Sequence, residues 1–158
     1  MTKKILSVLF ALLLSLSLFS GCSSSGDKEI DADALYSALK TELTFKDELI
    51  DMDMSAIMNF YFFEDANVIE KALVCKSASG ATAEEIAVIT VKTAADIEDV
   101  KAAVEMRVDD LAFNFENYVP AEMEKIENAI VKTAGRSIIL VVADDVDAAQ
   151  NVIDNYTK

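Results

Sequence analysis

Two uninterrupted apolar runs set the tightest limit on how this chain folds. Residues 86–91 read Ile-Ala-Val-Ile-Thr-Val, and residues 138–142 read Ile-Ile-Leu-Val-Val. β-Branched residues favour strands, and a strand that is apolar at nearly every position is buried on both faces. We therefore predict that both runs are central strands of a sheet packed with helices.

A long amphipathic helix is the clearest single element. Apolar residues recur at intervals of three or four, which is the spacing of one helix face. They are Ile97, Val100, Val104, Val108, Leu111, Phe115 and Tyr118. The spacing predicts a helix over residues 95–119, and Pro120 ends it or opens a short helix over 122–128.

The remaining segments complete an alternation of helices and strand pairs. Asp or Ser residues at 31 or 33, 53 or 55, and 144 or 145 are suited to cap the first, second and last helices. The predicted strands cover residues 68–77, 83–92, 129–134 and 137–143. The order α-α-β-β-α-(α)-β-β-α predicts one α+β domain over residues 31–158, with a four-stranded, mainly antiparallel sheet packed with helices.

The first 30 residues are predicted to be a lipoprotein signal peptide and a tether. Two lysines precede an apolar run over residues 5–19, and Ser-Gly-Cys22 follows. This arrangement is typical of a secretory signal peptide, and its ending resembles a bacterial lipobox in which Phe19 replaces the usual Leu. The resemblance implies a signal peptide over 1–21, a lipid on Cys22 and a tether over 22–30. The alternatives are an ordinary secreted protein with a coincidental Cys, and an uncleaved anchor.

Composition excludes several functions. The chain has 28 Asp+Glu against 14 Lys+Arg, a formal net charge of −14 and no His. Nucleic acids require a basic surface, so we expect no nucleic-acid partner. Without His, a Ser-His-Asp triad and an imidazole metal site are excluded. Cys75 lies in an apolar run and is predicted to be a core residue rather than a nucleophile.

Two acidic clusters, at residues 51–53 and 144–147, raise the question of calcium. Neither cluster has the alternating ligands, central Gly and terminal Glu of an EF-hand, so helix capping is the favoured interpretation. We expect no metal and no cofactor.

Arg107 and the adjacent glutamates Glu84 and Glu85 are candidate polar site residues. Arg107 lies at the flank of the long apolar stripe. It suits a carboxylate or anion clamp in a cleft, or a structural ion pair with Glu84 or Glu85. Consecutive strand residues point to opposite faces, so the glutamates are not expected to act on one substrate together. We expect one to be solvated and the other paired.

An adaptable binding patch is predicted near the second helix. Methionine and aromatic side chains gather there, and they suit either a binding surface or ordinary core packing. The cluster comprises Met52, Met54, Met58, Phe60, Tyr61, Phe62 and Phe63. Tyr118, at the end of the long helix, is expected either to line the same groove or to plug the sheet.

Several stretches carry a resemblance to a known family. They are Ser-Gly-Ala-Thr-Ala-Glu-Glu-Ile-Ala-Val at 79–88, Arg107, Phe-Glu-Asn-Tyr-Val-Pro-Ala-Glu at 115–122, and the strand at 138–142. With the lipobox, they resemble DUF4358, a domain of unknown function found in Gram-positive lipoproteins. The resemblance covers most of residues 30–157. It implies the α+β fold and the location, and it implies no activity.

These observations together predict a lipid-anchored lipoprotein on the extracytoplasmic face of the cell membrane. We expect a non-catalytic binding domain, which contacts the membrane through its lipid and takes an envelope protein as its candidate partner. One alternative is an envelope enzyme that uses carboxylates or an oxygen-ligated metal. Another is a structural envelope component. The sequence predicts no particular oligomeric state.

Overall fold

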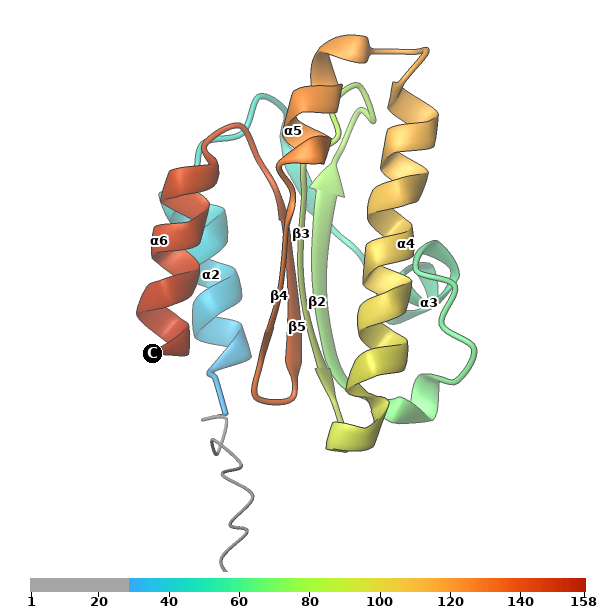
Figure 1. Ribbon diagram of the computed structural model, residues 1–158, viewed down its shortest axis with the longest axis vertical. Coiled ribbons are helices and arrows are strands. Elements are labelled where there is room, and N and C mark those ends of the chain that lie inside the picture. The colour runs from blue at the N-terminus through green and yellow to red at the C-terminus, as the bar shows by residue number, and fades with distance from the viewer. Residues whose placement is uncertain (1–28) are drawn as a thin grey trace, which may run out of the picture.

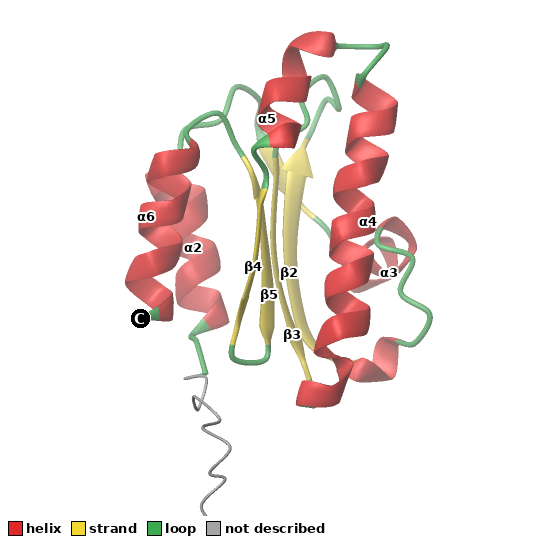
Figure 2. Cartoon of the chain, viewed as in Figure 1, coloured by secondary structure: helices red, strands yellow, loops and turns green. Residues whose placement is uncertain are grey.

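The fold is a five-stranded antiparallel sheet with helices on both faces (Figure 1, Figure 2). The computed structural model describes residues 29–158; Cys22, the predicted signal peptide and most of the predicted tether lie outside the described residues. The strands are β1 (Leu49–Asp51), β2 (Ile69–Ser77), β3 (Glu85–Val91), β4 (Ile130–Ala134) and β5 (Ser137–Val142). They lie in the order β1-β2-β3-β5-β4, and every neighbouring pair is antiparallel.

The α+β class and the antiparallel sheet are confirmed, but the predicted number of four strands is wrong. The additional strand is β1, which pairs with the end of β2 through Leu49 opposite Ser77 and Asp51 opposite Cys75. With only three residues, β1 is too short to show an alternating pattern in the sequence. The exposed edge of β2 defines it instead, because that edge offers backbone groups for pairing.

Helices cover the two faces in separate groups. α2 (Ala32–Glu42) and α6 (Val146–Thr157) lie side by side on one face (Figure 1). α3 (Met54–Phe60), α4 (Ile97–Phe115) and α5 (Met123–Glu127) contribute to the core on the other face. Each helix group thus closes one of two hydrophobic cores that the sheet separates.

The central strands have the predicted two-sided burial. Every residue of β3 and β5 is buried. Alternate residues join opposite cores: Val88 and Ile139 belong to the core under α2 and α6, whereas Ile89 and Leu140 belong to the core under α4. This division follows from the alternation of side chains along a strand.

Three helices begin at the predicted acidic caps. Asp31, Asp53 and Asp145 each accept a hydrogen bond from a backbone N–H three residues later, at 3.0, 2.8 and 2.9 Å. These bonds satisfy N–H groups that have no partner within the helix. Capping therefore accounts for one carboxylate in each acidic cluster.

The long helix is shorter than its sequence pattern predicts. α4 is preceded by a 3₁₀ turn over Ala94–Asp96, and it ends at Phe115. Four residues separate this end from Pro120, and Tyr118 within that segment is 74% exposed. Val119, directly before Pro120, has a non-helical backbone, as a following proline favours. Among residues 29–158, no helix is both long and apolar enough to cross a membrane.

Candidate functional site

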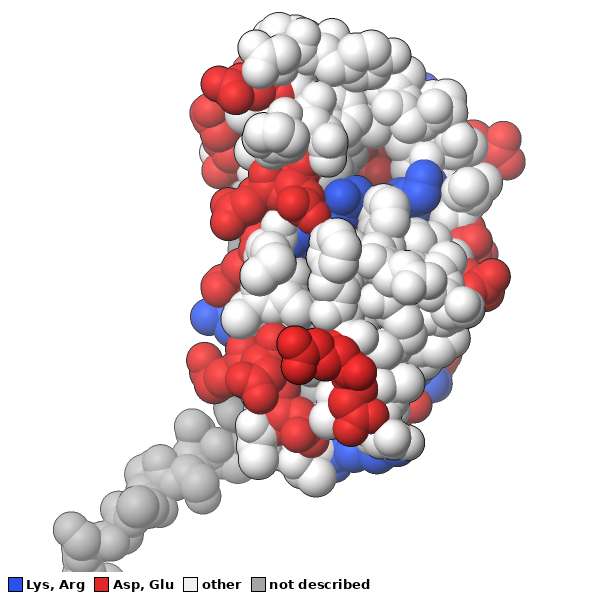
Figure 3. Space-filling model, turned by 90° about the vertical axis from the view of Figure 1, so that its right-hand side faces the viewer, with Lys and Arg blue, Asp and Glu red and all other residues white. Residues whose placement is uncertain are grey.

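Two hollows lie on the α3 and α4 side of the sheet. The first, the Arg107 pocket, has a volume of about 230 Å³, and its walls include Phe60, Lys76, Glu85, Arg107, Leu111 and Phe115. The second, the α3–α4 groove, has a volume of about 660 Å³, and its walls include Phe62, Phe63, Asp65, Asp99, Val100 and Met106. Figure 3 shows this side of the molecule, where Lys and Arg atoms lie near the middle with acidic side chains above and below.

A buried ion pair forms one wall of the Arg107 pocket. Arg107 Nη2 lies 2.8 Å from Glu85 Oε2, and Arg107 Nε donates to the same oxygen at 3.1 Å. The two side chains are only 9% and 1% exposed. The guanidinium also stacks on Phe60, with 3.9 Å between Cζ and the ring centroid. The predicted ion pair of Arg107 with one of the two glutamates is confirmed, and the partner is Glu85.

Tyr61 completes the hydrogen bonding of Glu85. Its hydroxyl donates to Glu85 Oε1 at 2.5 Å, and the residue is 1% exposed. Burial, followed by the charge of Glu85, holds the pKa of Tyr61 well above its ordinary value. Tyr61 is therefore a neutral donor near pH 7. The candidate binding residue Tyr61 thus lies in the core, where it connects the ion pair to the aromatic segment after α3.

Glu84 belongs to a separate buried network. It accepts hydrogen bonds from the backbone N–H groups of Lys46 and Asp47 at 2.7 and 3.0 Å, and Lys125 Nζ lies 3.1 Å away. The expectation that one of the two glutamates is solvated is wrong, because Glu84 and Glu85 are each 1% exposed. Glu84 escapes solvent because a distant loop and α5 supply donors that the local sequence does not show.

Electrostatics keep Glu84 and Lys125 charged. Burial raises the pKa of Glu84, but the hydrogen bonds from Lys46, Asp47, Thr82 and Lys125 outweigh it and hold the pKa below its ordinary value. Burial likewise lowers the pKa of Lys125, but its bonds to Glu122 and Glu84 outweigh that effect and raise the pKa overall. The pair connects α5 to the segment directly before β3, and Glu84 also binds the backbone of the loop before β1.

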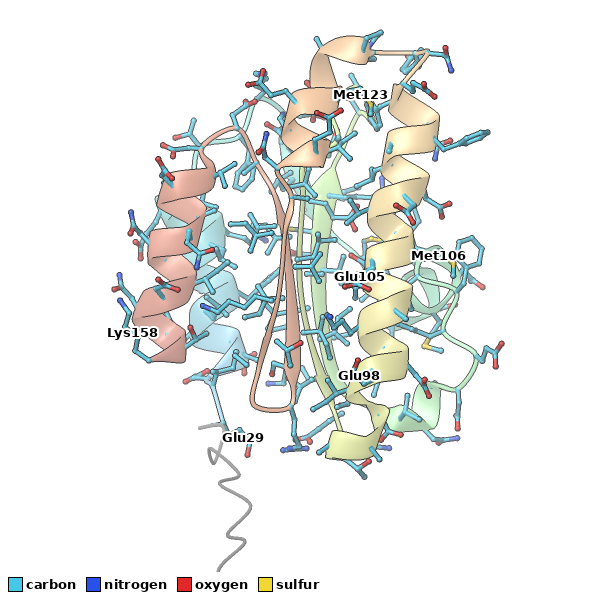
Figure 4. All side chains as sticks on the ribbon, viewed as in Figure 1. Glu29, Glu98, Glu105, Met106, Met123 and Lys158 are labelled. Carbon is cyan, nitrogen blue, oxygen red and sulfur yellow. The ribbon has the colours of Figure 1, made fainter. Side chains whose placement is uncertain are left out.

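The α3–α4 groove contains part of the predicted methionine and aromatic cluster. Phe62 is 65% exposed, and its backbone has a φ of 53°, a left-handed conformation that is rare for a bulky residue. Met106 is 54% exposed, and Figure 4 shows it on the α3 side of α4. The ring of Phe63 stacks on Tyr61 at a centroid distance of 5.5 Å. Met58 is half-buried on α3.

Tyr118 does not join these residues. It is 74% exposed, close to Pro120, so it does not plug the sheet. It is also absent from the walls of the two hollows. The structure therefore separates Tyr118 from the other candidate binding residues.

A family comparison matches most of this architecture. The model of a domain of unknown function matches residues 42–143. The chain belongs to the DUF4358 family. In this DUF4358 protein, the matched span contains all five strands and the helices α3, α4 and α5, whereas α6 lies beyond it. Comparisons with curated proteins and with solved structures return no match.

Sequence reasoning missed several polar residues of this DUF4358 domain. Lys76 lines the Arg107 pocket, and Lys125 and Glu122 form a 2.9 Å ion pair beside Glu84. Lys76 directly follows the apolar strand segment that ends at Cys75. A charge at that place needs a polar partner or solvent, and this signal could have marked Lys76 as a candidate. Lys125 gave no comparable signal, because it stands among charged residues on a short helix.

Proposed function

We propose that this protein is a lipid-anchored, non-catalytic binding domain on the extracytoplasmic face of the cell membrane. In this proposal, the α3–α4 groove binds a segment of another envelope protein. The observation that carries the proposal is Phe62, a large apolar side chain that is exposed at the groove in a strained backbone conformation. The lipid anchor rests on the lipobox at Cys22.

The conformation of Phe62 is unfavourable for the isolated domain. A non-glycine residue in the left-handed region raises the free energy by roughly 1–3 kcal/mol, and such residues cluster at functional sites. Burial of the Phe62 ring offsets little of this strain energy, since 65% of the residue stays exposed. A partner that covers the ring would bury apolar surface and offset the strain.

The groove walls indicate the chemistry of the partner. Phe63, Val100 and Met106 supply apolar surface. Glu64, Asp65 and Asp99 supply carboxylates, and the described residues of the groove wall include no Lys or Arg. Complementary charge favours recognition and speeds association, so the fitting occupant is a segment with apolar and basic side chains.

The place where the described chain begins is consistent with an accessible groove. α2, which follows the tether, lies across the sheet from α3 and α4 (Figure 1). The described chain therefore begins on the face of the sheet opposite the groove. The strong negative charge of the chain also opposes contact of the domain itself with anionic lipid headgroups.

The bonding of the buried carboxylates favours binding over catalysis. Glu85 is occupied by Arg107 and Tyr61, and Glu84 by Lys125 and backbone N–H groups. A general base near neutral pH needs a pKa raised toward 7, whereas the pKa of Glu84 is lowered. Glu84 is therefore poorly suited to act as a general base at pH 7.

Site-specific photo-crosslinking in intact cells tests the proposal. A photoreactive phenylalanine analogue is placed at Phe62, or at Tyr118 as a matched exposed aromatic control. We expect one protein to crosslink strongly from position 62 and weakly from 118, and Asp99→Lys to reduce the yield at 62. Equal yields at the two positions, or no effect of Asp99→Lys, would overturn the assignment of the groove.

A fractionation experiment tests the anchor separately. Cys22→Ser removes the sulfur that would carry the lipid, so we expect the protein to leave the membrane fraction. Conversely, a Cys22→Ser protein that remains in the membrane fraction would favour the uncleaved anchor.

A further inference from the structure

The Arg107 pocket contains hydrogen-bonding capacity that the protein itself does not use. Arg107 donates to Glu85 through Nε and Nη2, which leaves Nη1 with no hydrogen bond to any described residue. The side chain is 9% exposed and lines the pocket. A guanidinium with a free amino group at a pocket wall is suited to hold an anion.

Lys76 adds a second cation to the same pocket. Its Nζ lies 5.6 Å from the centroid of Phe60 and donates to the Ser77 carbonyl oxygen at 3.3 Å. Among residues 29–158, no carboxylate lies within 4.0 Å of Lys76 Nζ. In so acidic a chain, a lysine without a carboxylate partner beside a partly free arginine is an unusual placement.

The charged side chains that line the pocket are two cations and two carboxylates. Glu85 pairs with Arg107, and Glu84 accepts from backbone N–H groups and from Lys125, which it shares with Glu122. Lys76 is the lining cation that forms no ion pair within the described residues. One positive charge next to the carboxylate of Glu85 favours a monoanion over a dianion, because Glu85 would repel the second negative charge.

The rest of the wall is apolar. Phe60, Leu111 and Phe115 line the pocket beside the two cations. Its volume of about 230 Å³ is below the 300–1,000 Å³ of typical pockets for drug-sized ligands. The occupant is therefore a small molecule or a chain end with a short apolar body.

From this geometry we propose that the Arg107 pocket binds a small apolar monocarboxylate. The carboxylate accepts hydrogen bonds from Arg107 Nη1 and Lys76 Nζ, while the apolar body contacts Phe60 and Leu111. The same chemistry is present in a free carboxylic acid and in the C-terminal carboxylate of a peptide. This site is distinct from the α3–α4 groove and does not depend on the docking proposal.

Calorimetric titration of the purified full chain tests the site with defined probes. Isocaproate supplies a carboxylate on a branched apolar chain, and isocaproamide is its uncharged counterpart. A leucine dipeptide with a free or an amidated C-terminus tests the peptide source. We expect a Kd of about 1 mM or tighter for isocaproate and at least about tenfold weaker binding of isocaproamide, because a charge-assisted hydrogen bond is lost.

The choice of variants keeps the test independent of folding. Lys76→Met removes one proposed contact and breaks no ion pair in the described chain, so the fold is expected to persist. It should weaken isocaproate binding about tenfold. The control is Lys71→Met on the same strand, whose ammonium pairs with Asp33 instead; it should leave binding unchanged.

Amide NMR shifts locate the site. Isocaproate should shift the signals of Lys76 and Leu111 and leave those of Phe62 and Met106 unchanged. Equal binding of acid and amide, unchanged binding by Lys76→Met, or shifts confined to the groove would overturn the proposal. If the dipeptide with a free C-terminus binds and isocaproate does not, the site binds peptide C-termini. If neither carboxylate binds but position 62 still crosslinks to a partner, only the pocket proposal is refuted and the groove proposal stands.

Discussion

Replacing Arg107 by methionine gives the sharpest test of the structure. Methionine keeps the length and the apolar stem of the side chain, and it removes the charge and every donor to Glu85. Glu85 is 1% exposed, so solvent does not replace the lost partner. The hydroxyl of Tyr61 remains the one donor to this carboxylate among the described residues.

The structure sets the size of the effect. Breaking a buried ion pair by removing one partner destabilises a protein by about 3–5 kcal/mol. We therefore expect Arg107→Met to lower the free energy of unfolding by about 4 kcal/mol at pH 7.

Urea unfolding of the variant and the unaltered protein at pH 7 measures this loss. At pH 7 the loss corresponds to a fall in Tm of about 10–15 °C for a domain of this size. Lys101→Met on the same helix is the matched control, since its pair with Glu105 is exposed and contributes less than about 1 kcal/mol. Adding Glu85→Gln to Arg107→Met should restore part of the stability, because no uncompensated buried charge then remains. A loss no greater than that of Lys101→Met would refute the prediction.

Three further predictions follow from other parts of the structure. Because the pKa of Glu84 is lowered in the folded state, the charged Glu84 stabilises the fold above pH 4.5, and this stabilisation is lost as the pH falls further. Glu84→Gln should therefore reduce the fall in Tm that is measured between pH 6 and about pH 3. An unchanged fall in Tm would count against the role of Glu84. Phe62→Asn should increase the unfolding free energy by about 1 kcal/mol, since Asn tolerates the left-handed conformation, and a less stable variant would contradict the strain. In a Cys22→Ser chain, Cys75 should resist alkylation until the protein unfolds, because it is fully buried and burial raises its pKa; rapid labelling of the folded protein would disprove this.

Local patterns explain why much of the fold could be predicted. The strands β3 and β5 are apolar at nearly every position, so burial on both faces was the consistent interpretation. The apolar stripe of α4 indicated its buried face, and for three helices one of the two predicted cap residues is the observed cap. For Arg107 the sequence offered two interpretations, and one of them, an ion pair with Glu84 or Glu85, is present in the structure with Glu85 as the partner.

Long-range contacts explain what could not be predicted. β1 is too short to carry a pattern, and pairing with β2 defines it. The bond between Lys125 and Glu84 joins residues 41 positions apart, so neither local sequence indicates it. The backbone strain of Phe62 depends on how α3 ends, and the residue type gives no sign of it.

The Arg107 pocket shows the same division. The sequence indicated both an ion pair and an anion clamp as roles for Arg107. It could not indicate that Nη1 is left without a hydrogen bond to a described residue, because that depends on how the side chain meets Glu85. Lys76 became a candidate only when the fold brought β2, α3 and α4 together around Phe60.

The sequence of the segment that crosslinks to position 62 in intact cells tests the central claim most directly. We expect one recurrent segment of a single envelope protein, with apolar residues interspersed with Lys or Arg. Crosslinks spread over many unrelated proteins, or a recurrent segment rich in Asp and Glu, would contradict it.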